Sequence, residues 1–344
     1  MMEDMTSLER IAAAHRGNPQ PRPPYTFTLS LYGAKLIECP LTEYYRNPQC
    51  YAEGQDAVVD LCSPDILFSP FAAGLEAEAF GSELKFFSNY PPNVRKPAVH
   101  SADEFLNLSM PDVDSDPSLC YLRESVRYLA KKSNIQTPVC GVLTTPVDLP
   151  AIIMGIDMWI ETLVFAPEKA AAIIDKTKEH FVRMANALLT DGAAFISVPT
   201  MFANPQILYQ KLIDTLIIPA LTDAFHHVDG AIVFHHGGNP IVPYLEGYLS
   251  LPKVAGFVVD HRDSLDEARK ILGEKRLLLG NICGPTLSRK SMEQILIDVE
   301  TILDNRKDDP YFIFSTSGAD VPWDTPPELL QAISHKICAF RQKA

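Results

Sequence analysis

The chain has 344 residues, with 43 acidic and 30 basic side chains, so its formal net charge at neutral pH is −13. Hydrophobic residues make up 47% of the chain and charged residues 21%, a balance that is typical of globular proteins and argues against disorder. Nucleic acid binding is disfavoured, because phosphate contacts need clustered Lys and Arg, and no run of basic residues here exceeds two.

No apolar run approaches the roughly 20 residues that a membrane-spanning helix needs, and the acidic N-terminus lacks the apolar core of a signal peptide. The seven cysteines are odd in number, scattered, and include no Cys-x-x-Cys pair. Such a set is more typical of reduced thiols than of a disulfide framework. We therefore expect a cytoplasmic protein with no membrane partner and no nucleic acid partner.

Residues 1–24 predict an N-terminal helix, with Thr6 or Ser7 as its N-cap, followed by a Pro-rich linker. Two apolar stretches come next in the chain. They predict a first strand at Tyr25–Leu31 and a second strand around Val58–Leu67.

Beyond residue 137 the chain alternates short apolar runs, which predict strands, with longer amphipathic stretches, which predict helices. The six expected strands are 138–143, 194–198, 231–234, 256–259, 277–279 and 311–314. The expected helices are two that meet at Ala166-Pro167, one over 206–228, one over 264–272, one over 288–303, and a last one from Pro326-Pro327.

Strands that are apolar on both faces and alternate with helices indicate parallel pairing within a sheet that is covered on both sides. Eight such units predict an α/β fold, a single (β/α)8 TIM-type barrel over residues 1–344 with an N-terminal helical extension. A doubly wound open sheet is the alternative, but no Gly-x-Gly-x-x-Gly motif follows any expected strand.

In a TIM barrel the active site forms at the carboxyl ends of the strands. The polar residues expected there are Thr144, Thr145, Thr200, His235, His236, Asp260, His261, Asn281, Cys283, Ser315 and Ser317. The Ser and Thr residues are expected to cap helices and loops. The His235-His236 pair precedes a Gly-Gly turn, so at least one imidazole is expected in the barrel mouth, the alternative being one packed ring and one solvated ring. Cys283 is either a small buried apolar residue or a thiolate ligand.

Four segments together resemble the uroporphyrinogen decarboxylase superfamily. They are Gly-Leu-Glu-Ala-Glu-Ala-Phe-Gly-Ser-Glu at 74–83, His-His-Gly-Gly-Asn at 235–239, Gly-Asn-Ile-Cys-Gly-Pro at 280–285 and Ser-Gly-Ala-Asp-Val-Pro-x-x-Thr-Pro at 317–326. The order and spacing of these segments match over nearly the whole chain. The resemblance implies a single-domain TIM barrel and one of two chemistries, cofactor-independent decarboxylation of porphyrinogens or methyl transfer to or from a corrinoid.

The decarboxylase branch carries an N-terminal Arg-Gln-Ala-Gly-Arg stretch that grips substrate carboxylates. Here the segment after the first expected strand reads Ser-Leu-Tyr-Gly-Ala-Lys at 30–35, without paired Arg. Because Arg is the side chain that pairs bidentately with carboxylates, the decarboxylase or lyase interpretation is disfavoured.

In the methyltransferase branch, the members that act on thiols carry a His-x-Cys-Gly-Asn block and a later Gly-Cys segment. These two segments together bind zinc. In this chain His235 matches the His, but Gly237 and Ala319 stand where the two Cys are expected, and Cys283 replaces a usual Asp. Without both thiolates a substrate thiol cannot be activated in the same way. A coenzyme M-type thiol methyltransferase therefore remains an alternative that needs a rebuilt site.

The favoured hypothesis is a methyltransferase that takes the methyl group of a methoxylated aromatic and passes it to cob(I)alamin on a separate corrinoid protein. A Lewis acid or a proton donor at the ether oxygen would lower the barrier to its departure. The corrinoid must come on a partner, because the chain lacks an Asp-x-His-x-x-Gly corrinoid motif.

The expected site residues fall into three groups. Catalytic residues are His236, Asp260 and Asn281; zinc ligands are His235 and Cys283, with Asp260 or Asp320 as further candidates; substrate contacts are Ser317, Asp320 and Tyr32. In the competing interpretation no metal binds, and His236 protonates the leaving group directly, with a pKa tuned by an acid such as Asp260.

Overall fold

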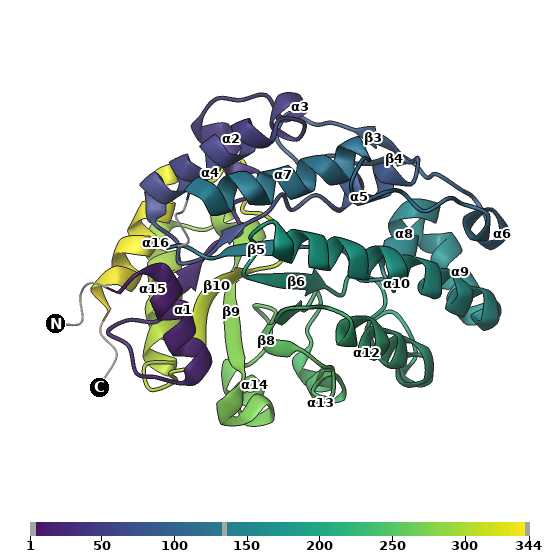
Figure 1. Ribbon diagram of the computed structural model, residues 1–344. Helices are drawn as coiled ribbons and strands as arrows, with labels where there is room; N and C mark the ends of the chain where they lie inside the picture. The colour runs from purple at the N-terminus through teal and green to yellow at the C-terminus, as the bar shows by residue number, and fades with distance from the viewer. Residues whose placement is uncertain (1–4, 133–135, 341–344) are drawn as a thin grey trace.

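Eight parallel strands form the centre of the protein, with helices outside them (Figure 1). The structure is a computed structural model that describes residues 5–132 and 136–340. The strands are β1 (Tyr25–Thr26), β2 (Leu67–Phe68), β5 (Val139–Val142), β6 (Phe195–Pro199), β7 (Ile232–His235), β8 (Val254–Val258), β9 (Leu277–Cys283) and β10 (Phe312–Ser317). They pair in the order β1-β10-β9-β8-β7-β6-β5-β2, so the predicted (β/α)8 barrel is confirmed.

Hydrogen bonds at the starts of β1 and β2 bring the two ends of this sheet together. Asp65 N donates to Tyr25 O at 2.8 Å, and Thr26 Oγ1 donates to Ile66 O at 2.9 Å. On its other side β1 pairs with β10, where Tyr25 lies opposite Phe314. Because all neighbours in the barrel are parallel, the carboxyl ends of the strands meet at one end, here termed the mouth.

The helices occupy the segments between and around the strands. The α-helices are α1 (Ser7–Arg16), α2 (Tyr32–Leu36), α3 (Leu41–Tyr44), α4 (Pro48–Cys62), α5 (Ala73–Ala79), α6 (Ala102–Leu106), α7 (Pro117–Lys132), α8 (Leu149–Met154), α9 (Ile156–Phe165), α10 (Pro167–Thr190), α11 (Gln210–Leu212), α12 (Ile218–His226), α13 (Leu245–Tyr248), α14 (Leu265–Leu272), α15 (Met292–Asn305) and α16 (Pro327–Ala339). A π-helical turn, η1 (Ile213–Ile217), three 3₁₀ turns, η2 (Val242–Tyr244), η3 (Gly273–Lys275) and η4 (Gly284–Arg289), and an antiparallel hairpin of β3 (Glu83–Lys85) and β4 (Asn93–Lys96) complete the described elements.

The N-terminal helix α1 packs against the barrel strands. Thr6 caps it, as predicted, through a capping box in which Glu9 N donates to Thr6 Oγ1 and Thr6 N donates to Glu9 Oε2. Its buried Ala14 lies in an apolar cluster with Val233 of β7 and Ile313 of β10. This burial explains why the helix is part of the fold and not a loose extension.

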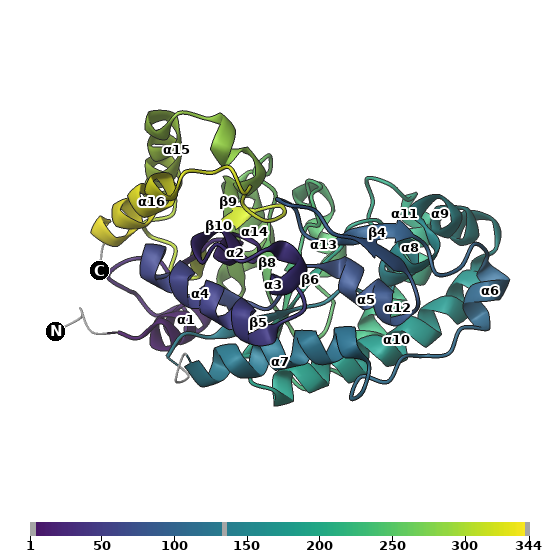
Figure 2. The same cartoon turned by 90° about the horizontal axis from the view of Figure 1, so that it is seen from above.

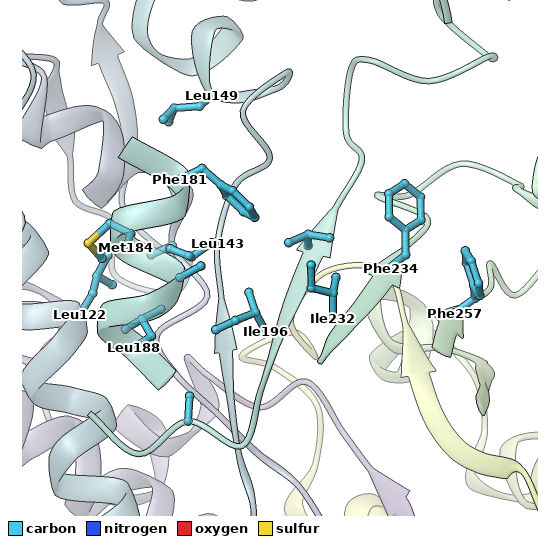
Figure 3. Close-up of a cluster of buried hydrophobic side chains, with 14 of the residues drawn as sticks. Leu122, Leu143, Leu149, Phe181, Met184, Leu188, Ile196, Ile232, Phe234 and Phe257 are labelled. Carbon is cyan, nitrogen blue, oxygen red and sulfur yellow. The ribbon is translucent and has the colours of Figure 1, made fainter. Parts of the chain in front are cut away.

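The main core lies between the barrel and the helices that cover it. Figure 3 shows this packing beside α10, where Phe181, Met184 and Leu188 face Leu143 and Ile196. The apolar positions of α10 recur every three or four residues, which places them on the one face that meets the sheet.

The second expected strand is wrong over most of its length. Residues from Val58 to Cys62 belong to α4, and the strand is only Leu67–Phe68. Asn47 caps α4 and Pro48 occupies its first turn, so the apolar residues up to Cys62 follow helical spacing. The first strand is likewise shorter than expected, because beyond Thr26 the backbone bonds to side chains instead of a strand ladder.

Two expected helices begin later than predicted. The segment over 206–228 contains α11, a π-helical turn at Ile213–Ile217 and α12, with Pro219 in the first turn of α12. Proline has no N–H to donate to the preceding turn, which accounts for the irregular helix there. The helix expected over 288–303 starts at Met292, because Ser291 caps it by accepting a hydrogen bond from Gln294 N.

Among the described residues, no helix is both long enough and apolar enough to cross a membrane.

Asp65 joins α1 and the linker to the barrel, and its removal should destabilise the fold. Its carboxylate accepts hydrogen bonds from Arg10 Nε at 3.2 Å, Arg22 Nη1 at 2.6 Å and Tyr25 N at 3.0 Å. We expect Asp65→Ala to lower the free energy of unfolding by about 3 kcal/mol, because it leaves buried donors unpaired. Urea denaturation measures this change.

The matched control is Asp56→Ala, which removes an exposed ion pair with Lys132. Such a pair should contribute less than about 1 kcal/mol. Equal losses in the two variants would mean that the Asp65 cluster has no special role in stability.

Candidate functional site

Three hollows lie at and inside the mouth, and each is named here by its position. The axial cavity, inside the strands, has a volume of about 30 Å³ and is lined by His235 and by apolar side chains such as Phe68. The mouth pocket, of about 360 Å³, is lined by Asp320, Arg289 and others. The side pocket, of about 80 Å³, is lined by Glu76.

The side chain of Phe71 is common to the lining of all three hollows. Its backbone is held in place, since Phe71 N donates to Ser30 Oγ at 2.8 Å. Phe71 therefore lies where the three hollows come close to one another. Neither its sequence neighbours nor its spacing points to this position.

The predicted histidine pair lies at the end of β7 and forms a stack. The rings of His235 and His236 are 4.4 Å apart with an angle of 20° between their planes. His235 Nδ1 accepts a hydrogen bond from Gly237 N at 3.0 Å, which fixes the ring above the axial cavity. Burial, and then the neighbouring His236, hold the pKa of His235 well below its ordinary value.

His236 is fully buried and is surrounded by hydrogen-bond donors. Gly318 N lies 3.2 Å from its Nε2, and Gly238 N lies 3.0 Å from its Nδ1. Burial lowers the pKa of His236 to about 4, although Asp260, whose Oδ2 lies 3.3 Å from Nδ1, favours the charged ring. Both imidazoles are therefore neutral at physiological pH.

Asp260 follows β8 and is joined to this pair, as predicted. Burial alone would raise its pKa, but hydrogen bonds from Arg262 hold the pKa of Asp260 below its ordinary value. Asn281 sits behind it: Nδ2 donates to Asp260 O at 3.0 Å and to Asp263 O at 2.9 Å. Asn281 thus positions the loop that carries Asp260, and its amide nitrogen donates both of its N–H groups within the protein.

Asp320 follows β10 and is the acid whose environment is most perturbed at the mouth. Its Oδ1 accepts hydrogen bonds from Ser30 N at 2.8 Å and Leu31 N at 3.4 Å, while its buried Oδ2 has no partner in the described part of the chain. Burial raises the pKa of Asp320 to about 8, and the two backbone bonds offset this only in part. A carboxylic acid that keeps its proton at neutral pH is a proton donor.

The remaining predicted site residues are divided between the mouth and the core. Ser317 is buried at the end of β10, where Oγ donates to Ile282 O at 3.4 Å. Cys283 is half-buried at the end of β9, opposite Ser317 in the strand register. Tyr32 is not brought to the mouth, because its ring is fully buried and its hydroxyl donates to Thr325 O.

The expected zinc site at His235 and Cys283 lacks a third ligand. Within residues 5–132 and 136–340, these two side chains join no third His, Cys or carboxylate in a group whose ligand atoms lie within 4.8 Å of one another. A catalytic zinc needs about three protein ligands, so the donors at the strand ends do not fit it. The interpretation without a metal is the one that this geometry favours.

Sequence reasoning missed a buried acid beside the barrel. Glu76 Oε1 accepts hydrogen bonds from Thr144 N at 2.8 Å and Thr144 Oγ1 at 2.7 Å, and burial raises the pKa of Glu76 to about 7. His180, whose Nε2 lies 3.9 Å from Glu76 Oε2, has a pKa lowered by burial to about 4. The one available signal was a Glu on the otherwise apolar face of a short helix.

The family model of uroporphyrinogen decarboxylase (URO-D) matches residues 6–338. A methylcobamide:CoM methyltransferase MtaA from Methanosarcina barkeri is 22% identical over 315 residues, covering 88% of this chain and 90% of that protein. A methylcobamide:CoM methyltransferase MtbA from Methanosarcina acetivorans is 23% identical over 82% of this chain and 84% of its own length.

A solved methyltransferase from Methanosarcina mazei superposes with a TM-score of 0.85 at 19% identity, over 97% of this chain and 99% of that one. A B12-independent methionine synthase from Shewanella sp. W3-18-1 superposes with a TM-score of 0.55 at 11% identity, over 86% of this chain and 88% of that one. Both likenesses establish the fold.

The raised pKa of Asp320 predicts a pH-dependent cost to stability. Its ordinary value is 3.8, so between pH 4 and 8 the folded state holds a proton that the unfolded state has lost, and rising pH favours unfolding. We expect Asp320→Asn to gain stability relative to wild type across this range, by up to about 1.4 kcal/mol per pH unit. The difference should level off above pH 8.

Denaturant melts at pH 5, 6, 7, 8 and 9 measure this difference. The matched control is Asp324→Asn, an exposed acid on the same pocket, which should run parallel to wild type at every pH. Parallel curves for Asp320→Asn as well would mean that Asp320 is ionised in the folded protein.

Proposed function

The chain belongs to the uroporphyrinogen decarboxylase family, and from that premise we propose that it is a corrinoid-dependent methyltransferase whose methyl donor is a small methoxylated aromatic. The methyltransferase part of the proposal is supported by relatives named methylcobamide:CoM methyltransferases, which align over most of both chains. The donor part is supported chiefly by one observation, the buried Asp320 carboxyl at the mouth pocket, whose Oδ2 has no partner among the described residues and whose pKa is raised by burial.

The proton matters because of what remains when the methyl group departs. The bonding electron pair stays on the donor oxygen, and alkoxide or phenoxide is a poor leaving group unless it takes a proton. Below about pH 8 the Asp320 carboxyl holds a proton, and its Oδ2 has no partner among the described residues. When Asp320 gives this proton to the leaving oxygen it becomes a carboxylate, which solvent then reprotonates. The corrinoid, carried by a separate protein, supplies the nucleophile that accepts the methyl group.

The mouth pocket suits an aromatic donor. Phe71, Leu31 and Tyr90 supply apolar and aromatic surface, and exposed Arg289 supplies a cation at the same pocket. An aromatic ring carrying both a methoxy group and a carboxylate would match these groups, because Arg binds carboxylates in a bidentate manner. The neutral histidine pair adds polar surface above the axial cavity without placing a charge there.

A thiol methyltransferase is the second candidate function. The names of the aligned relatives favour it, since each acts with coenzyme M. Against it stand Gly237 and Ala319 at the positions where thiolate ligands are expected, and the missing third ligand near His235. This candidate would have to activate the thiol without the zinc ligands that the sequence comparison predicts.

A donor panel tests the proposal. Purified protein is incubated with cob(I)alamin, free or on a corrinoid protein, and with methoxybenzoates, methylamines or methylated thiols, and formation of methylcobalamin is followed by its absorption. We expect transfer from methoxybenzoates and none from the other two classes. Transfer from a methylated thiol, or from methylcobalamin to coenzyme M, would instead establish the second candidate.

Asp320→Asn should remove the proton donor while keeping the shape of the side chain. We expect the rate of methyl transfer to fall about 100-fold, the usual contribution of a positioned acid. In wild type, kcat should decline above about pH 8 as Asp320 loses its proton, and this decline should disappear in the variant. Arg289, Asp324, Tyr44 and Tyr45 are the titratable groups nearby, and Asp324→Asn serves as the control.

A wild-type rate that is flat from pH 7 to 10 would remove the acid role from Asp320. An Asp320→Asn variant that retained the wild-type rate and pH profile would also exclude Asp320 as the acid.

Phe71→Ala should join the three hollows and relax donor specificity. Removing the ring should connect the axial cavity with both pockets. Small donors then lose packing contacts with the ring, and bulkier aromatic donors gain space. We expect kcat/KM for the best small donor to fall about 10-fold, as for lost packing of 1–2 kcal/mol, while a larger homologue improves. Phe165→Ala, on an exposed side chain of α9, is the control.

Unchanged relative rates for small and large donors in Phe71→Ala would show that the donor does not meet this ring.

A further inference from the structure

Two cysteines and a glutamate meet on the helices beside β1, away from the histidine pair. Cys39 Sγ, Cys50 Sγ and a carboxylate oxygen of Glu43 all lie within 4.8 Å of one another. In the part of the chain that the structure describes, this is the one group of three or more His, Cys, Asp or Glu side chains with that spacing. Figure 2 shows α2, α3 and α4, the helices that position these residues, lying together.

Local structure holds each donor in place before any ligand arrives. Cys39 follows α2, and its backbone N–H donates to Ala34 O at 2.9 Å. Glu43 lies in the first turn of α3. Cys50 lies in the first turn of α4, where Asn47 Oδ1 accepts hydrogen bonds from Gln49 N and from Cys50 N at 3.3 Å.

The two halves of the cluster are also fixed relative to each other. A Cβ atom on Gly33 would lie 2.7 Å from the backbone of Gly54, so α2 and α4 cross with their backbones in contact. The buried rings of Tyr44 and Tyr51, 5.0 Å apart, fill the space beneath. The sulfur atoms are therefore held by rigid backbone segments, and bringing them together costs little further entropy.

The chemistry of the cluster favours a cation. Cys50 Sγ donates to Glu43 Oε1 at 3.7 Å, and Glu53 follows one turn later on the same side of α4. The three side chains offer two sulfur atoms and one carboxylate oxygen, the donor types that zinc takes in proteins. Both cysteines are free and partly exposed, which leaves a path from solvent.

We propose that Cys39, Glu43 and Cys50 form a zinc-binding site that clamps the turn after α2 to the start of α4. Two thiolates and one carboxylate are zinc ligands in proteins, and water or Glu53 would complete a tetrahedral set. The site is a structural one: Tyr44 and Tyr51, on the helices that carry Glu43 and Cys50, donate hydrogen bonds to Ser30, whose backbone N donates to Asp320. It does not depend on the methyl donor or on the proposed reaction.

Metal binding by the purified full chain tests the site. Protein is stripped with chelator under reducing conditions and titrated with zinc and, separately, with cobalt(II), whose thiolate complexes absorb in the near ultraviolet. We expect one equivalent of either metal, a thiolate-to-cobalt absorption band, and a melting temperature that rises with zinc concentration, as mass action requires for a ligand of the folded state.

The variants Cys39→Ser and Cys50→Ser should each weaken zinc binding about 100-fold, and Glu43→Gln about 10-fold, the range seen when groups at a metal site are removed. Both Cys variants should lose the cobalt band and the thermal shift. Cys120→Ser, on α7, is the matched control and should behave as wild type.

Three outcomes would overturn the proposal. They are less than a tenth of an equivalent of zinc bound by reduced wild-type protein, one full equivalent retained by the Cys39→Ser/Cys50→Ser double variant, and a Cys39–Cys50 disulfide in protein that has never been exposed to reductant. Loss of methyl transfer would neither be required nor be sufficient, so the two proposals can fail separately.

Discussion

The burial of the Asp320 carboxyl is the interaction on which the mouth of the barrel depends. The ladder between β1 and β10 is only two residues long, and beyond it the first strand has no regular partner. Beyond this ladder, Asp320 Oδ1 holds the segment after β1 by accepting hydrogen bonds from Ser30 N and Leu31 N. A backbone hydrogen bond from Val321 N to Thr28 O lies next to them. The carboxyl that joins the loop after β10 to the segment after β1 is thereby buried away from water, and burial raises its pKa.

Other loops at the mouth are organised in the same way, by buried carboxylates that accept several backbone N–H groups. Asp148 accepts from Met201 N, Phe202 N and Ala203 N, which holds the loop after β6. Asp263 does the same for the loop after β7, accepting from Ile241 N and Val242 N. Loops need such acceptors because their backbone groups have no neighbouring strand.

Burial and hydrogen bonding set the charge of each titratable side chain at the mouth. Both imidazoles are neutral, because burial opposes a proton and backbone N–H groups already face their ring nitrogens. Asp260 stays ionised because Arg262 stabilises it, whereas Asp320 has only backbone donors and stays protonated. Two carboxyl groups with opposite protonation states at one mouth are suited to a reaction in which a leaving group takes a proton.

The sequence by itself determined the fold and the positions of several polar residues at the ends of the strands. Apolar runs alternating with amphipathic helices beyond residue 137 predicted the parallel barrel, because strands that are buried on both faces and separated by helices are typical of parallel sheets. The position of His235 and His236 at the end of a strand was predictable for the same local reason, and so was the cap at Thr6. Where the local signal was mixed, at the short first two strands and over 206–228, the predicted boundaries were wrong.

Only the tertiary structure decided which of the polar residues share a site and in which protonation state. The raised pKa of Asp320 depends on Ser30 and Leu31, which lie nearly 300 residues away in the chain and bury it. The same holds for Phe71 between the three hollows and for Cys39 beside Cys50. Burial and proximity are properties of the folded chain. The residues next to a carboxyl or thiol in the sequence do not indicate which distant backbone segment will pack against it.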